Sequence, residues 1–142
     1  MFLFKQHPKK QIGFEDIKIA IKDPDRYILI NTLPRIEQDV LIHNTVSIEH
    51  EEKIINIQLN DYNIPDIPVI VYGRNSCDTS AELKQKQLRS LGIVDVYIYP
   101  GGLFEWLLLQ DAYGDDEFPS TNNVPSDTLR YRVKSTFVPP KI

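Results

Sequence analysis

The sequence predicts an α/β fold, a small parallel sheet sandwiched by helices, from two observations. Short apolar runs rich in β-branched and aromatic residues alternate with longer segments in which apolar residues recur at helical spacing. Because a helical segment separates each apolar run from the next, consecutive strands are expected to be joined by crossovers and to lie parallel. The predicted strands are residues 27–31, 46–48, 69–72 and 94–99.

Length and composition describe one globular domain. The chain has 142 residues, of which 42% are hydrophobic and 25% charged, enough to bury one core. Its net charge of −4 and pI of about 5.3 give no reason to expect a nucleic-acid or membrane partner. No apolar run approaches the roughly 20 residues that span a bilayer.

The start of the chain and its cysteine content indicate where the protein is located. The first residues, MFLFKQHPKK, are apolar and then basic, which is the reverse of a secretory signal. The single cysteine, Cys77, excludes an internal disulfide and is normal in a reducing compartment. We therefore expect a cytoplasmic protein.

The first half of the chain alternates between helix and strand. After a polar lead-in, apolar residues from Phe14 to Ile21 recur at helical spacing, and Asp-Pro-Asp at 23–25 stops this helix. The apolar run that follows predicts a central strand. Beyond a turn-rich connection, Val46 and Ile48 predict a short strand, and residues 49–59 predict a helix with one apolar stripe.

The stretch around the third strand is where we expect an active site. The apolar strand 69–72 leads into a polar loop, residues 73–80, and then into a helix over 81–91 that Gly92 ends. A strand, a loop and a helix start together collect backbone amides that suit an anion. The side chains that can cap the helix are those of Ser76, Asp78 and Thr79.

The last predicted helix, residues 103–113, is apolar almost all round. It is therefore buried on more than one side, or its face at Leu107–Leu109 binds a protein partner or a second copy of the chain. We favour packing within the chain, because the Pro-rich remainder can cover the helix as an extended C-terminal strap. The side chains expected to anchor this strap are Tyr131, Val133, Phe137 and Val138.

A signature follows the fourth predicted strand. Gly101, Gly102 and Trp106 form the pattern Gly-Gly-x-x-x-Trp, and LGIVDVYIYPGG leads into it. In its order after strand, loop and helix, this pattern resembles the rhodanese-like domain family, and LIHNTVSI at 41–48 is similar to the family's HIPGAINI segment. The resemblance implies a lead-in at 1–11, a rhodanese-like domain at 12–113 and a C-terminal extension at 114–142 packed on the domain.

A longer segment resembles one branch of this family in particular. GGLFEWLLLQDAYGDDEFPST, residues 101–121, looks like a branch of single-domain rhodanese-like proteins seen in protists and large DNA viruses. If the chain is viral, a virion-associated protein is the alternative to the cytoplasmic one expected above.

Two positions depart from the family pattern. Active members carry a catalytic Cys directly after the strand, where loop amides and the helix dipole hold its persulfide, and this sequence has Gly73 there. The family's Asp-x-Arg motif, which helps to lock the loops, is replaced by Asn31, Thr32 and Leu33. The resemblance and its departures imply a catalytically degenerate module, a pseudoenzyme that serves in protein binding or assembly.

The alternative is a sulfurtransferase or persulfide carrier that uses Cys77, four residues after Gly73. The helix N-terminus and Arg74 favour a thiolate there, whereas Asp78 opposes it. The loop can also bind an anion without chemistry, or only satisfy its own backbone. The candidate residues are the nucleophile Cys77 and an anion-binding loop formed by Gly73, Arg74, Asn75, Ser76, Asp78, Thr79 and Ser80.

Other chemistries lack the residues they need. A phosphatase of this architecture has an arginine six positions after its cysteine, where this chain has Leu83. His43, Glu49, His50 and Glu51 do not have zinc-site spacing, and the acidic residues of 111–117 lack a twelve-residue calcium loop. No glycine-rich nucleotide fingerprint is present. We expect no metal and no cofactor.

Overall fold

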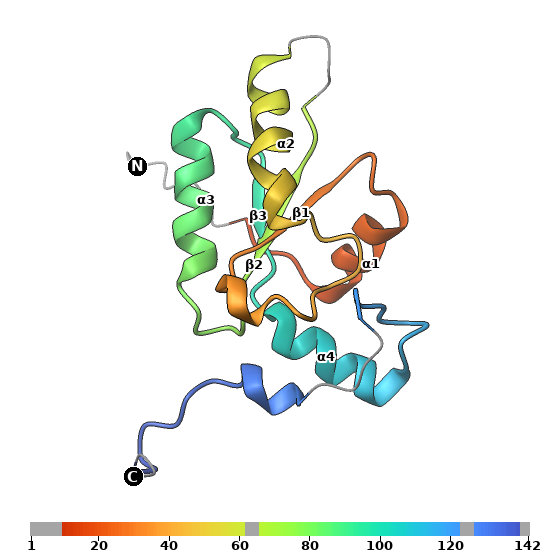
Figure 1. The fold of residues 1–142 in the computed structure, drawn as a ribbon, viewed down its shortest axis with the longest axis vertical. Coiled ribbons are helices and arrows are strands. Elements are labelled where there is room, and N and C mark those ends of the chain that lie inside the picture. The colour runs from red at the N-terminus through yellow and green to blue at the C-terminus, as the bar shows by residue number, and fades with distance from the viewer. Residues whose placement is uncertain (1–9, 62–65, 123–126, 140–142) are drawn as a thin grey trace, which may run out of the picture.

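A three-stranded parallel sheet forms the centre of the structure, a computed structural model that describes residues 10–61, 66–122 and 127–139. The strands are β1 (Ile28–Asn31), β2 (Val69–Tyr72) and β3 (Val96–Ile98), and β2 lies in the middle (Figure 1). Ile28 pairs with Val69, which in turn pairs with Val96, so the three strands are in level register. The predicted α/β class with a small parallel sheet is confirmed.

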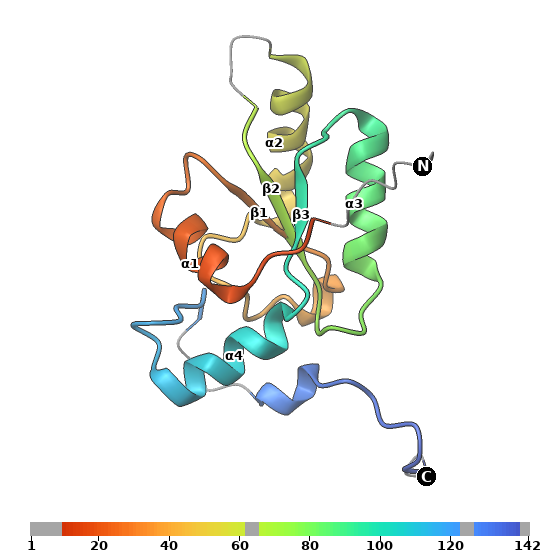
Figure 2. The same ribbon diagram turned by 180° about the vertical axis from the view of Figure 1, so that it is seen from behind.

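In the described parts of the chain, four α-helices cover the two faces of this sheet. α1 (Phe14–Lys22) and α4 (Gly102–Tyr113) pack on one face, and α2 (Ile48–Asn60) and α3 (Ser80–Leu91) pack on the other (Figures 1 and 2). None of these helices is long and apolar enough to cross a membrane; the longest, α2, has 13 residues.

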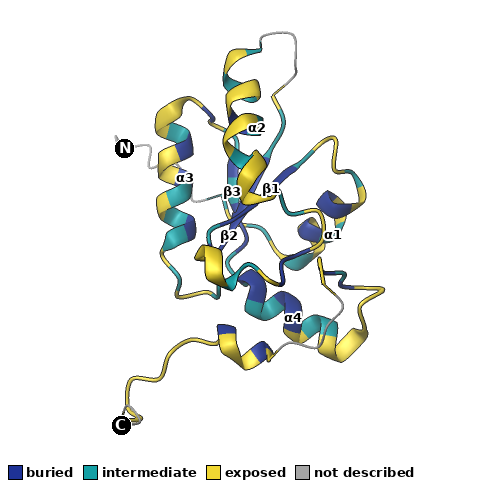
Figure 3. Ribbon diagram, viewed as in Figure 1, coloured by how far each residue is buried: buried dark blue, intermediate teal, exposed yellow. Residues whose placement is uncertain are grey.

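Each face of the sheet has its own core cluster. Leu29 and Ile70 pack with Trp106 of α4, whereas Ile30 and Val71 pack with Leu88 of α3. Successive residues of a strand point to opposite faces, so a strand covered on both sides is apolar at every position. Figure 3 shows β1 and β2 buried along their whole length.

The predicted strand at 46–48 is wrong. Its first residue contacts the sheet, where the Val46 amide donates to the Leu29 carbonyl at 2.8 Å. Asn44 has a left-handed backbone with φ of 66°, which interrupts an extended path. The amides of His50 and Glu51 then donate to the Ser47 carbonyl, so the chain turns into α2 at Ile48.

The end of the lead-in lies beside the sheet. The amide of Ile98 donates to the Lys10 carbonyl at 2.8 Å, and the amide of Ile12 donates back to the Ile98 carbonyl at 2.9 Å. These bonds cover the outer edge of β3, where unpaired backbone groups would otherwise be exposed. Residues 1–9 of the predicted lead-in lie outside the described residues.

The chain after α4 returns over the core. Phe118 is buried against Trp106, with ring centroids 5.0 Å apart, and the Trp106 indole donates to the Pro119 carbonyl at 2.9 Å. The Thr121 amide donates to the Leu41 carbonyl at 2.8 Å. The tryptophan of the Gly-Gly-x-x-x-Trp signature thus holds the start of the C-terminal segment.

Only one of the four predicted strap anchors is buried. Tyr131 ends a short 3₁₀ helix, η2 (Thr128–Tyr131), and is fully buried beside α4. Val133, Phe137 and Val138 are exposed, because the chain leaves the body after η2 (Figure 1). Pro125 and Pro140 of the Pro-rich remainder lie outside the described residues.

The three residues of the partner face predicted on α4 differ in exposure. Leu107 is buried in the core, Leu109 is half-buried, and Leu108 is exposed. The Leu107 side chain therefore packs within the chain.

Candidate functional site

The candidate site is the loop between β2 and α3, at the carboxyl edge of the parallel sheet. Open parallel sheets bind their ligands at this edge, because loops and helix N-termini gather there. β1 ends beside the loop, and α4 begins against it (Figure 1). The predicted site residues from Gly73 to Ser80 therefore lie together.

The first turn of α4 holds the backbone of the loop in place. The Leu103 amide donates to the Gly73 carbonyl at 3.0 Å, and the Phe104 amide donates to the Arg74 carbonyl at 2.9 Å. Gly102 has a φ of +65°, and a Cβ atom there would lie 2.6 Å from the Gly73 carbonyl oxygen. The second glycine of the signature is therefore required by close backbone contact with the loop.

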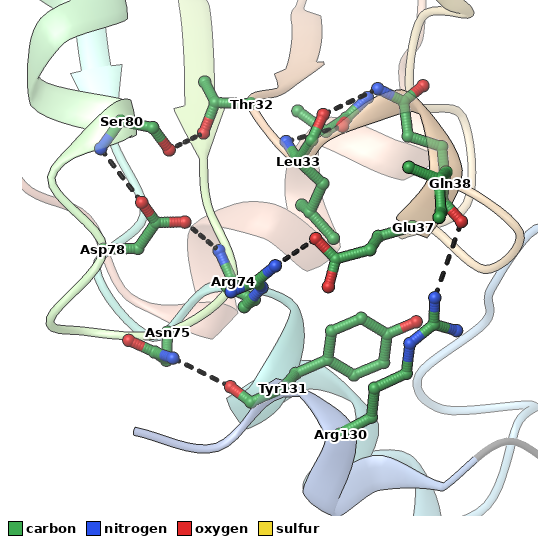
Figure 4. Close-up of polar contacts among 12 residues, drawn as sticks. Thr32, Leu33, Glu37, Gln38, Arg74, Asn75, Asp78, Ser80, Arg130 and Tyr131 are labelled. Carbon is green, nitrogen blue, oxygen red and sulfur yellow. Dashed lines mark hydrogen bonds and ion pairs between the residues drawn. The ribbon is translucent and has the colours of Figure 1, made fainter. Parts of the chain in front are cut away.

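The Asp78 carboxylate occupies the centre of the loop (Figure 4). Its Oδ2 accepts the amide of Arg74 at 2.9 Å and its Oδ1 accepts the amide of Ser80 at 3.0 Å. A Cβ atom at Gly73 would lie 2.7 Å from the same Oδ2. The carboxylate thus fills the space into which a side chain at position 73 would project.

The electrostatics of the loop favour this internal anion. Partial burial raises the pKa of Asp78, but the amide of Arg74, the amide and hydroxyl of Ser80, and the Arg74 charge together outweigh burial and hold that pKa below its usual range. Asp78 is therefore ionised at neutral pH. The sequence predicted Asp78 as a loop member and a helix cap, and had no local signal for its position under Gly73.

The Arg74 side chain points away from this carboxylate. Its guanidinium forms a partly buried ion pair with Glu37 of η1 (Arg35–Glu37) (Figure 4). Arg74 thus contributes its amide to the anion at the loop centre, while its side chain ties the loop to the segment after β1. Sequence reasoning missed Glu37, because 37 positions separate it from Arg74 and no local pattern joins them.

Cys77 lies at the outer surface of the loop. The residue is exposed, and its amide donates to the Asn75 side-chain oxygen at 3.0 Å. Cys77 and Thr79 line a surface depression together with Arg132 and Lys134 from the C-terminal segment. Ser76 is exposed at the same turn.

Neutral side chains connect the end of β1 to the loop. The Thr32 and Ser80 hydroxyls lie 2.6 Å apart (Figure 4). The Asn31 side chain accepts the amide of Leu33 at 3.0 Å, and the Gln38 amide group donates to the Leu33 carbonyl at 2.9 Å. Hydrogen bonds of neutral groups thus shape this segment.

η2 closes the loop from the side opposite β1. The Asn75 side chain donates to the Tyr131 carbonyl at 2.9 Å (Figure 4), and Arg130 pairs with Asp39 at 3.1 Å. Thr128 donates to Asp111 of α4 at 2.9 Å. The sequence signal for Tyr131 was an aromatic residue in a Pro-rich, polar segment, which predicted its burial and not its contact with the loop.

Comparisons with known proteins agree on the family. A model of the rhodanese-like domain family matches residues 21–109. A single-domain sulfurtransferase of Saccharomyces cerevisiae is similar with a TM-score of 0.55 and 20% identity, over 82% of this chain and 100% of its own. A protein of Anabaena sp. is similar with a TM-score of 0.56 and 17% identity, over 80% and 94%. A search of curated proteins gave no match.

The structural similarities and the family match support different conclusions. At identities of 20% and below, similarity to a solved structure establishes the fold alone. The family match rests on the sequence itself and spans more than half of the chain. It includes β1, β2, β3 and the loop that Asp78 fills. This chain belongs to the rhodanese-like domain family.

Proposed function

We propose that this rhodanese-like domain is a catalytically degenerate module that works by binding protein and does not transfer sulfur. The observation that carries the proposal is the Asp78 carboxylate, bound by the loop amides in the space that a residue-73 side chain would occupy. Gly73 itself has no nucleophile. Two amides of the loop that would surround a sulfur anion in an active relative, those of Arg74 and Ser80, are engaged by the chain's own carboxylate.

Electrostatics support the same conclusion. A substrate anion entering the loop has to displace Asp78 from two amide hydrogen bonds, and it meets the negative charge of that side chain as it approaches. Like charges a few ångströms apart repel strongly where water is partly excluded. The Arg74 guanidinium is paired with Glu37, so it is already occupied by a carboxylate of the chain.

A second candidate function, persulfide transport by Cys77, is favoured by one observation. The Cys77 side chain is exposed and shares a surface depression with the cations Arg132 and Lys134. An accessible thiol beside positive charge suits a nucleophile that exchanges sulfur with a protein or a small anion.

Sulfur transfer from thiosulfate separates the two functions. In the transfer step, a cysteine thiolate attacks the outer sulfur of thiosulfate, a new S–S bond forms, the S–S bond of thiosulfate breaks, and sulfite leaves. We expect the intact mass of the parent protein to be unchanged after incubation with thiosulfate. Cys77→Ser, treated in parallel, and an active sulfurtransferase are the negative and positive controls.

The intact mass after incubation with thiosulfate decides between the two functions. A gain of one sulfur atom by the parent, absent from Cys77→Ser, overturns the proposal and establishes Cys77 as a sulfur acceptor. An unchanged parent mass, with the positive control persulfidated, supports the degenerate module.

A further inference from the structure

A groove between α1 and the sheet is lined mostly by apolar side chains. Its apolar lining consists of Ile12, Ile19, Tyr27, Pro68, Ile70 and Tyr97. Among the described residues that line it, Asp16 alone is charged, and its carboxylate accepts the Gly13 amide at 3.2 Å. The groove therefore suits an apolar occupant.

The groove is open to solvent on the outer side of α1. Ile19 is 56% exposed, whereas Ile17 and Ile21 of the same helix are buried in the core. Tyr27 and Tyr97 are only partly buried. A single exposed apolar residue is ordinary, but several that line one groove indicate a contact surface.

The described chain begins beside this groove. Its first residue is Lys10, whose ammonium group lies 5.0 Å from the centre of the Tyr97 ring. The Lys10 carbonyl accepts the Ile98 amide, and Ile12 lines the groove two residues later. Residues 1–9, which lie outside the described residues, are therefore attached to the chain at the rim of the groove.

The attached segment carries the type of side chain that the groove suits. Residues 2–4 are Phe-Leu-Phe, and the mostly polar stretch KQHPK follows them. Phe4 precedes Lys10 by six positions, which span about 20 Å when extended. Three neighbouring strands of a sheet are only about 10 Å across. Residues 2–4 can therefore reach the whole groove, from Tyr97 beside the chain start to Tyr27 before β1.

The covalent link favours this segment over a free partner. A binding group that is joined to its site by a short stretch of chain has an effective concentration of about a millimolar. A second copy of the chain, or another protein, has to be present at a comparable concentration or bind far more tightly to take its place. The segment nearest to the groove is thus its preferred occupant.

We propose that residues 2–4 bind in the groove of their own chain as an N-terminal arm, with Phe4 in contact with Ile19 and Tyr97. The arm completes the apolar cover of the α1 face near the ends at which the strands begin. This inference goes beyond the proposed function and is independent of it, because the site loop lies at the opposite, carboxyl ends of the strands.

Nuclear magnetic resonance of the full chain tests the contact directly. We expect nuclear Overhauser effects between the aromatic rings of Phe2 and Phe4 and the methyl groups of Ile12 and Ile19. In a mixture of one copy labelled in its phenylalanine rings with another labelled in its isoleucine methyl groups, these effects should be absent. Effects that persist in the mixture place the arm of a second copy in the groove, and an absence of effects within one chain leaves the groove without its arm. Either outcome overturns the inference.

Peptide binding tests whether the arm occupies the groove in the parent. The triple variant Phe2→Ser, Leu3→Ser, Phe4→Ser removes the apolar side chains of the arm and leaves the described chain unchanged. A synthetic peptide of residues 1–9, titrated to millimolar concentration, should bind this variant at least tenfold more tightly than it binds the parent. Equal binding to the two proteins, or no binding to the triple variant, overturns the inference.

A matched pair of substitutions in the triple variant locates the peptide. Ile19→Asp should weaken peptide binding by about tenfold or more, because it places a charge in the apolar groove. Leu83→Asp is the control, since Leu83 is an equally exposed apolar residue of α3 on the other face of the sheet. Both side chains are exposed, so neither substitution removes core packing, and far-UV circular dichroism verifies the fold. Equal effects of the two substitutions overturn the inference.

Discussion

At the scale of single residues, Gly73 and Asp78 act as a pair. Gly73 leaves a space beneath the loop, and the Asp78 carboxylate fills it while accepting the amides of Arg74 and Ser80. The sequence identified both as members of an anion-binding loop. It could not identify their contact, because the contact depends on the path of the loop backbone, which no local pattern encodes.

The pH dependence of stability tests the charge of Asp78. The folded state lowers the pKa of this carboxyl, so its contribution to stability is present above the unfolded pKa of about 4 and is lost as the pH falls through the folded value. We therefore expect Asp78→Asn to destabilise the protein at pH 7 and to differ less from the parent near pH 3. Urea unfolding at both pH values measures this difference.

The control for this prediction is Asp116→Asn, which neutralises an exposed carboxylate in the turn after α4. It should behave like the parent at both pH values. If Asp78→Asn lowered the free energy of unfolding by the same amount at pH 7 and pH 3, the lost interaction would not depend on ionisation of Asp78.

At the scale of elements, the junction between α4 and the site loop depends on Gly102. The left-handed backbone of this residue and the nearby carbonyl of Gly73 exclude a side chain. Gly102→Ala should lower the free energy of unfolding by about 3 kcal/mol or more, because it adds a steric overlap with backbone to the conformational strain. Urea denaturation gives the value.

Gly114 offers a matched comparison for that variant. It also has a positive φ, +98°, at the end of α4, but a Cβ atom there would meet nothing within 4 Å. Gly114→Ala should therefore carry the backbone strain alone, about 1–3 kcal/mol. Equal losses for the two variants would contradict a role for close contact with the loop.

The η2 segment depends on a single buried side chain. Tyr131→Ala removes a fully buried aromatic ring beside α4 and should cost about 3–5 kcal/mol. Hydrogen exchange of the Arg132 amide, which donates to the Leu129 carbonyl at 3.1 Å, should accelerate in this variant.

Val133→Ala is the control for Tyr131, since Val133 is exposed two residues later. It should change stability by less than about 0.5 kcal/mol and leave the exchange of Arg132 unaffected. If Tyr131→Ala behaved in the same way, η2 would not be held by its aromatic ring.

The elements differ in how well the sequence predicted them. β2, α3 and α4 begin and end within about one residue of their predicted bounds, because each is followed directly by a glycine, Gly73, Gly92 and Gly114 respectively. The strand at 46–48 was wrong because two apolar residues in alternation occur equally in the approach to a helix. Val133, Phe137 and Val138 were wrong as anchors, because apolar character does not specify what a side chain meets.

At the scale of the whole molecule, the fold was predictable and the arrangement of the site was not. Alternation of apolar runs and helical segments determines a covered parallel sheet, and both core clusters follow from it. The site depends on contacts between distant residues, such as Arg74 with Glu37 and Asn75 with Tyr131, which are 37 and 56 positions apart. Such pairs form only in the folded chain, and no local periodicity in the sequence predicts them.

The contacts of η2 also have a consequence for the order in which the protein is made. Arg130 and Asp39 are 91 positions apart, so the segment that closes the site loop is synthesised long after the strand and loop it contacts. The N-terminal part of a chain leaves the ribosome first during synthesis. The sheet, its helices and the Asp78 loop are therefore available to fold while η2 is still being translated. A nascent chain presents its site loop uncovered until translation passes Tyr131.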